Sequence, residues 1–369
     1  MRYFQTRSIG ALTRNDSVSV IGIGNLKVLE VLEVLKVLKV RIYSRFERVE
    51  HVEHLEHLEH LVLAVSRAGA YAGRMRAEIR QIQELMERES YVTDPSVATA
   101  VHLAIALRKP LLIEGHAGVG KTEVAKVLAT ALGTNLIRLQ CYEGLDAATA
   151  LYEWNYPKQL LHIKLDEHSE RPLAEREASI FSDRFLLRRP LLQAITQESA
   201  SPVLLVDEVD RSDEEFEAFL LEVLSDFQVT VPEIGTLRAV HVPHVVLTSN
   251  RSRELSEALR RRCLYLWIGY PSFEKELRIV HAKVPGIADR LAVQITRFVQ
   301  TVRGLKLAKV PGIAETIDWA AALVALHAPS LDEEIVRQTL GCFLKDEADH
   351  RAIEAELEAG RLSAMAGLP

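Results

Sequence analysis

The chain has 369 residues, of which 48% are hydrophobic and 26% are charged, and its formal net charge is −6 at pH 7. This composition is typical of a globular protein with room for two domains and an appendage. The negative balance argues against a nucleic-acid coat protein and against a protein that binds membrane surfaces. The chain has no apolar run of the roughly 18 residues that span a bilayer, and no signal-peptide pattern at its N-terminus.

The cysteines are few and widely separated. Cys141, Cys263 and Cys342 are odd in number and show neither a disulfide framework nor paired metal-ligand spacing. We therefore expect a protein of the reducing cytoplasm, without membrane insertion.

Residues 1–74 contain a three-residue repeat, LKVLEVLEVLKVLKV at 26–40 and HVEHLEHLEH at 51–60. A period of three matches neither the helical turn of about 3.6 residues nor the two-residue alternation of a strand. The repeat supplies four candidate metal ligands, His51, His54, His57 and His60, but an unselected triplet repeat explains them better. We interpret residues 1–74 as a low-complexity extension that is not native to the working protein. We expect synthesis to start at Met75, where an amphipathic helix begins.

A phosphate-binding loop is the strongest motif in the chain. The apolar residues 111–114 precede GHAGVGKT, a helical pattern follows it, and the loop matches G-x-x-x-x-G-K-[ST]. In such loops the glycines let backbone N–H groups surround a phosphate, while Lys121 reaches the β- and γ-phosphates and Thr122 binds Mg²⁺. We expect His116 to be simply exposed. The predicted ATP-binding residues are Gly115, His116, Ala117, Gly118, Val119, Gly120, Lys121, Thr122 and Glu123.

A second apolar strand ends in two acidic residues. Residues 203–206 read Val-Leu-Leu-Val, and Asp207 and Glu208 follow them directly. Such an ending is common on its own. Paired with the phosphate loop, it predicts that Asp207 binds ATP-associated Mg²⁺ through its hydration shell and that Glu208 polarises the attacking water as a general base.

Caps and periodicity predict the neighbouring elements. Asp94 caps a helix that starts with Pro95, and Ser212 forms a capping box with Glu215. A hairpin is expected around residues 233–235. The helix after the phosphate loop is expected to bury Val124, Val127, Leu128 and Leu132. The buried face of the helix after Ser212 is expected to contain Phe216, Phe219, Leu220, Val223, Leu224 and Phe227.

The order of these motifs resembles an AAA+ ATPase. DEVDRSDEEFEAFLLEVLSDFQVTVPEIGT and ALRRRCLYLWIGYP further resemble the MoxR family, in the branch of the accessory ATPases of carbon monoxide dehydrogenase maturation. The resemblance covers residues 75–369. It implies an α/β fold, with an AAA+ P-loop NTPase core of parallel sheet flanked by helices at residues 75–270. An all-α lid domain at residues 271–369 follows.

The resemblance also implies roles for residues outside the two motifs. Asn250, which ends a predicted core strand, stands at the position of the first sensor, which orients the attacking water. Arg262 and Arg261 stand where an arginine finger reaches the ATP of the adjacent subunit, a task that suits a planar guanidinium. Arg260 is expected to be solvated. The implied catalytic set is Glu208, Lys121, Asn250, Arg262 and Arg261, with ATP and Mg²⁺ as cofactors.

Two features depart from the family pattern or remain open. Glu315 stands where many relatives carry a second-sensor arginine, and Lys309 is a candidate replacement. Residues 142–189 form a longer connection than a simple crossover requires. In that segment Trp154 and Tyr156 are either partner contacts or buried residues.

The function that we expect is ATP-driven, chaperone-like remodelling that assists maturation, cofactor insertion or assembly of a client complex. By resemblance, the protein forms a hexameric ring and acts with a von Willebrand factor A domain protein on a client metalloenzyme. A small-molecule kinase could use the same loop but needs neither Asn250 nor the arginines. A DNA-dependent AAA+ motor calls for a basic surface, which the acidic balance disfavours, so we expect no nucleic-acid partner.

Overall fold

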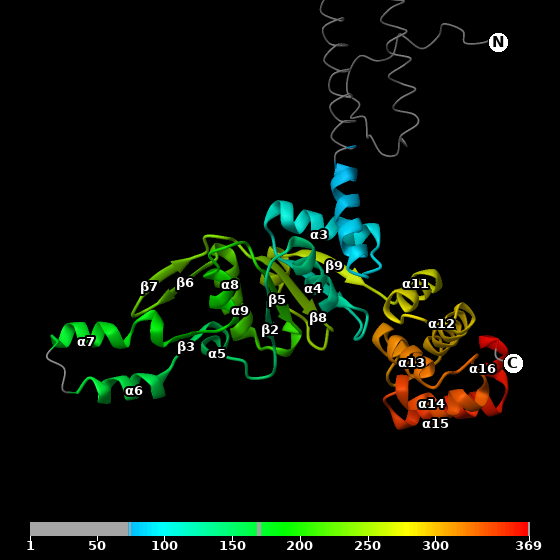
Figure 1. Ribbon diagram of the computed structural model, residues 1–369. Helices are drawn as coiled ribbons and strands as arrows, with labels where there is room; N and C mark the ends of the chain where they lie inside the picture. The colour runs from blue at the N-terminus through cyan, green and yellow to red at the C-terminus, as the bar shows by residue number, and fades with distance from the viewer. Residues whose placement is uncertain (1–72, 74, 168–170, 368–369) are drawn as a thin grey trace, which may run out of the picture. The chain divides into compact units, whose positions relative to one another are not determined.

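The computed structural model describes residue 73, residues 75–167 and residues 171–367. The chain divides into two compact units, Met1–Ala77 and Glu78–Pro369. The triplet repeat and its histidines lie outside the described residues, so their interpretation stays a prediction. The second unit is the subject below, with elements labelled as in Figure 1.

Five parallel strands form the central sheet, in the order β2-β5-β8-β1-β9 (Figure 1). Leu111 of β1 pairs with Val246 of β8 on one side and with Leu264 of β9 on the other. Because the strands are parallel, their carboxyl ends meet at one edge of the sheet. The bounds are Leu111–Gly115 for β1, Leu136–Gln140 for β2, Val203–Asp207 for β5, His244–Ser249 for β8 and Leu264–Ile268 for β9.

Helices cover both faces of this sheet, which explains the nearly continuous apolar sequences of its strands. Side chains alternate along β1, so Ile113 packs with α3 and α4 on one face while Leu112 packs with α8 and α9 on the other. Residues 78–88 form a helix whose Met86 joins the α3 and α4 side. The predicted α/β core is confirmed. The bounds are Pro95–Leu107 for α3, Lys121–Leu132 for α4, Pro190–Ile195 for α8, Glu214–Asp226 for α9 and Glu257–Arg262 for α10.

The long connection between β2 and α8 forms a small structure of its own. A short antiparallel pair, β3 with β4, carries the helices α6 and α7 between its strands. Trp154 is buried at 6% exposure, whereas Tyr156 is 60% exposed, so only the tryptophan belongs to the core. The bounds are Ala147–Leu151 for α5, Tyr152–Trp154 for β3, Tyr156–Leu165 for α6, Leu173–Ile180 for α7 and Leu186–Arg188 for β4.

The expected hairpin is confirmed. Strand β6, Gln228–Val231, pairs antiparallel with β7, Gly235–Arg238. Gly235 has φ of +101°, a conformation that glycine adopts without strain.

The C-terminal part of the described chain is entirely helical, as expected for a lid. Phe298, Trp319 and Phe343 form its aromatic centre, with ring centroids 4.3 to 6.0 Å apart. Arg303 forms a buried ion pair with Glu276 at 2.5 Å. The bounds are Phe273–Lys283 for α11, Asp289–Arg303 for α12, Ile313–Ala325 for α13, Glu333–Phe343 for α14, Glu347–Glu358 for α15 and Arg361–Ala366 for α16.

The predicted helix start at Asp94 and Pro95 is confirmed, but neither predicted side-chain cap is present. The cap of α9 is Asp213, whose carboxylate accepts the Phe216 N–H at 2.8 Å, while the Ser212 hydroxyl donates to the Val209 carbonyl. Asp94 does precede α3, but its side chain makes no cap hydrogen bond and instead forms an ion pair with Lys275. In each case the side chain binds another partner instead of capping the helix.

The structure also differs from the prediction at two residues that were expected on buried helix faces. Leu132, at the end of α4, is 37% exposed. Phe227 lies one residue beyond α9 in a left-handed conformation and is partly buried against the core. Both residues stand at helix ends, where periodicity no longer determines burial.

All three cysteines are free, and burial raises the pKa of Cys141 to about 12. No helix among the described residues has both the length and the apolar character needed to cross a membrane. In the same part of the chain, no cluster of three or more His, Cys, Asp or Glu residues could hold a metal ion.

Candidate active site

The loop between β1 and α4 has a backbone shape that requires glycine. Gly118 and Gly120 have φ of +72° and +89°, in the left-handed region that favours this residue. A Cβ at Gly115 would lie 2.1 Å from the Ile268 carbonyl oxygen. Because α4 begins at Lys121, its unpaired N–H groups and its dipole make the end of the loop an anion-binding position.

The Lys121 side chain is buried and already ordered. Its Nζ donates hydrogen bonds to the carbonyl oxygens of Gly115 and His116 at 2.9 and 2.6 Å, and to Asn250 Oδ1 at 2.7 Å. Burial lowers the pKa of Lys121, while the charges of nearby carboxylates act in the opposite direction. The structure therefore brings the predicted phosphate-binding lysine and the predicted sensor asparagine into direct contact.

Asp207, at the end of β5, faces the start of α4. Its Oδ1 accepts hydrogen bonds from Thr122 Oγ1 at 2.9 Å and from Thr248 Oγ1 at 2.5 Å. Its Oδ2 accepts a hydrogen bond from Arg138 Nε at 3.0 Å. A hydroxyl and a carboxylate are hard oxygen ligands of the kind that Mg²⁺ takes together with water and phosphate. Thr122 and Asp207 therefore fit a magnesium ion.

Glu208 is held from three sides. Its Oε1 accepts a hydrogen bond from Asn250 Nδ2 at 3.2 Å, and its Oε2 accepts one from Gln140 Nε2 at 3.2 Å. Arg211 pairs with Oε2 at 3.0 Å. The backbone of Glu208 has φ of 54°, an uncommon conformation for a non-glycine residue that is often found at functional sites.

Sequence reasoning missed Arg138, Gln140 and Thr248. The first two lie on β2, and only the pairing of β2 with β5 brings them to the acidic residues. Thr248 had a usable signal, because it stands two positions before Asn250 and strand alternation puts the two side chains on one face.

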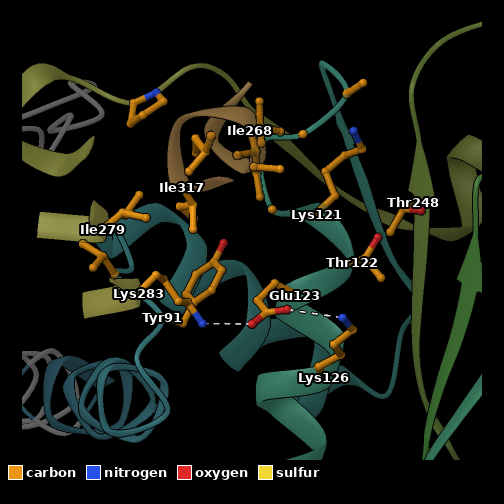
Figure 2. A pocket seen from close by; sticks show the side chains of 18 of the residues that line it. Tyr91, Lys121, Thr122, Glu123, Lys126, Thr248, Ile268, Ile279, Lys283 and Ile317 are labelled. Atoms are coloured by element: carbon orange, nitrogen blue, oxygen red, sulfur yellow. Dashed lines mark hydrogen bonds and ion pairs between the residues drawn. The ribbon is translucent and has the colours of Figure 1, made fainter. Parts of the chain in front are cut away.

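A cavity of about 440 Å³ opens beside these side chains and includes residues of the lid (Figure 2). Its volume lies within the usual range for small-molecule sites, about 300 to 1,000 Å³. Figure 2 shows an apolar side formed by Tyr91, Ile279 and Ile317, with Lys121 and Thr122 on the other side. The lining also includes Ala117, Gly118, Val119, Gly120, Glu123, Asp207, Glu208 and Asn250. The polar end suits phosphates, and the apolar end suits a base.

Glu123 connects the first turn of α4 to the lid. Its carboxylate lies between Lys283 of α11, at 3.0 Å, and Lys126 of its own helix, at 3.5 Å (Figure 2). Burial raises the pKa of Glu123, but the hydrogen bond and charge of Lys283 outweigh it, so the pKa lies below its ordinary value.

His116 is exposed, as expected, but its ring also contacts two aromatic residues. The ring is exposed but stacks on Tyr270 with centroids 4.7 Å apart, and it meets the edge of Trp267 at 5.7 Å. Tyr270 precedes the lid, and the Arg303 guanidinium lies 5.1 Å from its ring centroid. Neither Gly115 nor His116 lines the cavity, so His116 contacts the connection to the lid instead.

The lid helix α13 begins directly on the phosphate loop. The Gly118 carbonyl accepts the N–H groups of Ile313 and Ala314 at 2.9 and 3.1 Å. Glu315, expected at the position of the second sensor, caps this helix by accepting the Gly312 N–H at 2.9 Å. Lys309 does not line the cavity, and its backbone N–H is bonded to Asp349. The candidate replacement is therefore not in place.

None of the three arginines of α10 lines the cavity of its own chain. Arg260 is exposed, and its guanidinium lies 5.7 Å from the centroid of the Tyr265 ring. Arg261 pairs with Glu257 on the same helix. Arg262 lines a different hollow. The structure thus brings together Lys121, Thr122, Asp207, Glu208 and Asn250, and it leaves Arg261 and Arg262 apart from them.

The sheet order, the loop and the acidic strand end define the fold of an AAA+ P-loop NTPase, followed by C-terminal helices. Residues 110–263 match the family model described as AAA domain, dynein-related subfamily. This segment contains the phosphate loop, the acidic residues, Asn250 and the arginines of α10.

Similar proteins occur in staphylococci. An uncharacterized protein of Staphylococcus haemolyticus is 24% identical over 282 residues, which cover 74% of this chain and 99% of that protein. One of Staphylococcus aureus is 23% identical over 274 residues, 72% of this chain and 96% of the other. Among solved structures, the Thermotoga maritima RuvB Holliday junction branch migration motor is 19% identical with a TM-score of 0.41. The match covers 78% of this chain and 82% of RuvB.

Proposed function

We propose that the protein binds ATP with Mg²⁺ in this cavity and hydrolyses it to drive conformational work. The observation that carries the proposal is the contact of Asn250 with both Lys121 and Glu208, at the end of the cavity where α4 begins. The loop and Lys121 would bind the γ-phosphate, and Glu208 would deprotonate the attacking water.

Each residue has a separate task in this mechanism. The loop N–H groups and Lys121 bind the β- and γ-phosphates. Thr122 and Asp207 would hold a Mg²⁺ ion, which would supply positive charge beside the phosphate oxygens. Glu208 accepts the proton of the attacking water, and Asn250 keeps Glu208 Oε1 oriented by a hydrogen bond of 3.2 Å.

The work that this hydrolysis drives is chaperone-like remodelling in our proposal. Side chains of the core and of the lid line one cavity, so ATP binding and product release change contacts in both. The resemblance of the motifs to the MoxR family supports a client complex whose maturation, cofactor insertion or assembly is assisted. It also supports a hexameric ring with Arg262 or Arg261 as the finger, a von Willebrand factor A domain partner and a client metalloenzyme.

Replacement of the general base tests the proposal. Glu208→Gln keeps the side-chain shape but cannot take a proton, so hydrolysis should fall about 100- to 10,000-fold. Its affinity for ATP should remain within a few-fold of the wild-type value. Glu222→Gln, an exposed position on α9, is the matched control and should hydrolyse ATP normally. Phosphate release is measured without any acceptor, and nucleotide binding by calorimetry. Normal turnover by Glu208→Gln would contradict the mechanism.

The same assay separates the alternatives. A small-molecule kinase would release little phosphate until an acceptor is added. A DNA-dependent motor would be stimulated by DNA, with binding that falls steeply as salt rises. We expect acceptor-independent turnover that DNA leaves unchanged.

A further inference from the structure

The backbone of Glu208 turns sharply at the end of β5. Asp207 is the last residue of that strand, and Glu208 follows it with φ of 54° and ψ of 50°, in the left-handed region. Glycine adopts this conformation without strain, but glycine carries no carboxylate. A general base at this position therefore needs contacts that hold its backbone as well as its side chain.

One contact of this kind comes from Thr248, near the end of the neighbouring strand β8. The pairing of β5 with β8 runs as far as Val206 and Leu247, so the Glu208 N–H lies beyond it. The Thr248 hydroxyl supplies an acceptor instead, because its Oγ1 accepts the Glu208 N–H at 2.9 Å. A side chain thus bonds this N–H where the backbone pairing has ended.

The same hydroxyl is oriented by Asp207. Thr248 Oγ1 donates its proton to Asp207 Oδ1 at 2.5 Å, and the two residues are buried, at 1% and 2% exposure. A hydroxyl has one proton and two lone pairs, so a lone pair remains for the Glu208 N–H. Because its proton is used within the chain, Thr248 has none to donate to a nucleotide.

The Asp207 carboxylate is itself held from its other side. Arg138 donates to Oδ2 from Nε at 3.0 Å and from Nη2 at 2.5 Å, and Thr122 donates to Oδ1 at 2.9 Å. Together with the Thr248 hydroxyl, these donors leave the carboxylate one orientation. Figure 2 shows Thr248 beside Thr122 at the polar end of the cavity. Thr248 therefore connects a fixed carboxylate to the strained backbone of Glu208.

The side-chain contacts of Glu208 act at its far end. Asn250 and Gln140 each donate to one carboxylate oxygen at 3.2 Å, and Arg211 pairs with Oε2 at 3.0 Å. These contacts set the rotation of the carboxylate. They do not hold the backbone from which the side chain extends. Because a change in φ of Glu208 displaces the whole side chain, the bond from its N–H to Thr248 decides where the carboxylate lies.

We propose that Thr248 is a positioning residue for the general base. Its hydroxyl holds the left-handed backbone of Glu208 and so directs the carboxylate toward the attacking water. The position affects the rate because a general base must lie within hydrogen-bond reach of the proton that it removes. The proposal rests on the proposed function, since it takes Glu208 as the general base.

Two substitutions separate the hydroxyl from the shape of the side chain. Thr248→Val keeps the shape but makes neither hydrogen bond, so the turnover number should fall about 10- to 100-fold, a part of what a general base contributes. Thr248→Ser keeps the hydroxyl and should stay within about threefold of the wild-type turnover number. Thr296→Val removes a buried hydroxyl from α12 in the lid, and this matched control should hydrolyse ATP normally.

Binding measurements show whether the nucleotide and metal positions remain intact. Every variant should bind a non-hydrolysable ATP analogue as wild type does, by calorimetry. Mn²⁺ added with this analogue, followed by electron paramagnetic resonance, should also bind unchanged, because Asp207 keeps its contacts with Arg138 and Thr122. Turnover is compared below the melting temperature of each variant. If Thr248→Val does not fold, Thr248→Ala, which also lacks the hydroxyl, replaces it with the same expectations.

A double-mutant cycle with Glu208→Gln shows through which residue Thr248 acts. Glu208→Gln keeps the backbone contact but lacks the base, so adding Thr248→Val should lower its residual turnover by no more than about twofold. Independent effects would multiply instead. Single-turnover measurements with labelled ATP resolve these low rates.

The outcomes distinguish this proposal from the proposed function. If the wild type does not hydrolyse ATP, or if Glu208→Gln turns over normally, the proposed function fails. If both behave as expected, the role of Thr248 is overturned by wild-type turnover in Thr248→Val, by an equal loss in Thr248→Ser, or by losses that multiply in the double variant. Weaker Mn²⁺ binding by Thr248→Val would show that the residue acts through Asp207, and it would overturn the proposal as well.

Discussion

Asp210 holds the segment that carries Asn250. Its carboxylate is buried and accepts hydrogen bonds from the Asn250 N–H at 3.1 Å and from the Ser252 N–H and hydroxyl at 2.8 and 2.6 Å. Burial raises the pKa of Asp210, but these hydrogen bonds outweigh it, so the pKa lies below its ordinary value. The charged carboxylate is therefore the form that stabilises the fold.

We predict that Asp210→Asn lowers the free energy of unfolding by about 1–3 kcal/mol at neutral pH. The amide has one acceptor oxygen, so a buried N–H loses its partner. Because the folded pKa is depressed, the contribution of the carboxylate is complete above its unfolded pKa of about 3.9 and is lost as the pH falls through the folded pKa. The difference from wild type should thus shrink in acid. Urea denaturation at about pH 7 and about pH 3.5 measures it, and a constant difference would contradict the assignment.

The sequence predicts those parts of the site whose residues lie close together in the chain. Lys121 and Thr122 follow a loop of fixed spacing, and Asp207 and Glu208 directly follow an apolar strand. Arg138 could not be found in this way, because its contact with Asp207 depends on which strand lies next to β5. Sequence alone therefore indicates the nucleotide-binding chemistry and misses the side chains that orient it.

At the level of elements, the start of α13 links the lid to the core through backbone hydrogen bonds. Its first N–H groups are bonded to the Gly118 carbonyl, so the phosphate loop caps the lid helix. Gly312, which precedes α13, has φ of −84° and needs no glycine for its own conformation. It needs one for space, because a Cβ there would lie 2.8 Å from the Ala117 carbonyl oxygen and 2.9 Å from the Gly118 Cα.

Gly312→Ala should therefore displace α13 from the loop without unfolding the lid. Overpacking against backbone costs about 1–3 kcal/mol, so ATP affinity should fall about tenfold or more if nucleotide binding needs the docked helix. Gly341→Ala is the matched control, since its Cβ would meet only His350 Cε1 at 3.8 Å and it lies within α14. Calorimetric titration with an ATP analogue compares the two. Equal affinities would show that docking is irrelevant to binding.

The elements themselves were easier to predict than their ends. The apolar strands and the amphipathic α9 follow from periodicity, and the hairpin follows from its turn residues. The cap of α9 shifted by one residue, because Asp213 and Ser212 are both good caps and the structure gives Ser212 another partner. The contact between α13 and the loop has no local pattern, so no periodicity could indicate it.

For the folded unit as a whole, the nucleotide cavity lies where two hydrophobic cores meet. Tyr91 packs with the sheet, whereas Ile317 is packed against both the sheet cluster and the lid cluster. Both residues line the cavity. A bound base should therefore stabilise the two parts together, and its effect on unfolding reports how tightly they are coupled.

Ile317→Ala should reduce the stabilisation that ATP binding provides more than it reduces the stability of the lid itself. The change removes apolar contact with the base that is worth about 1–2 kcal/mol, so the dissociation constant for ATP should rise about tenfold. At equal nucleotide concentration the gain in unfolding free energy on binding then falls by about 1.4 kcal/mol. Ile335→Ala removes a partly buried isoleucine from the same lid cluster, away from the cavity, and should keep the full gain. Thermal unfolding with and without an ATP analogue makes the comparison. If both variants gain as much as wild type, the base does not contact the lid, and domain coupling must pass through Glu123 and Lys283 or through α13 and the loop instead.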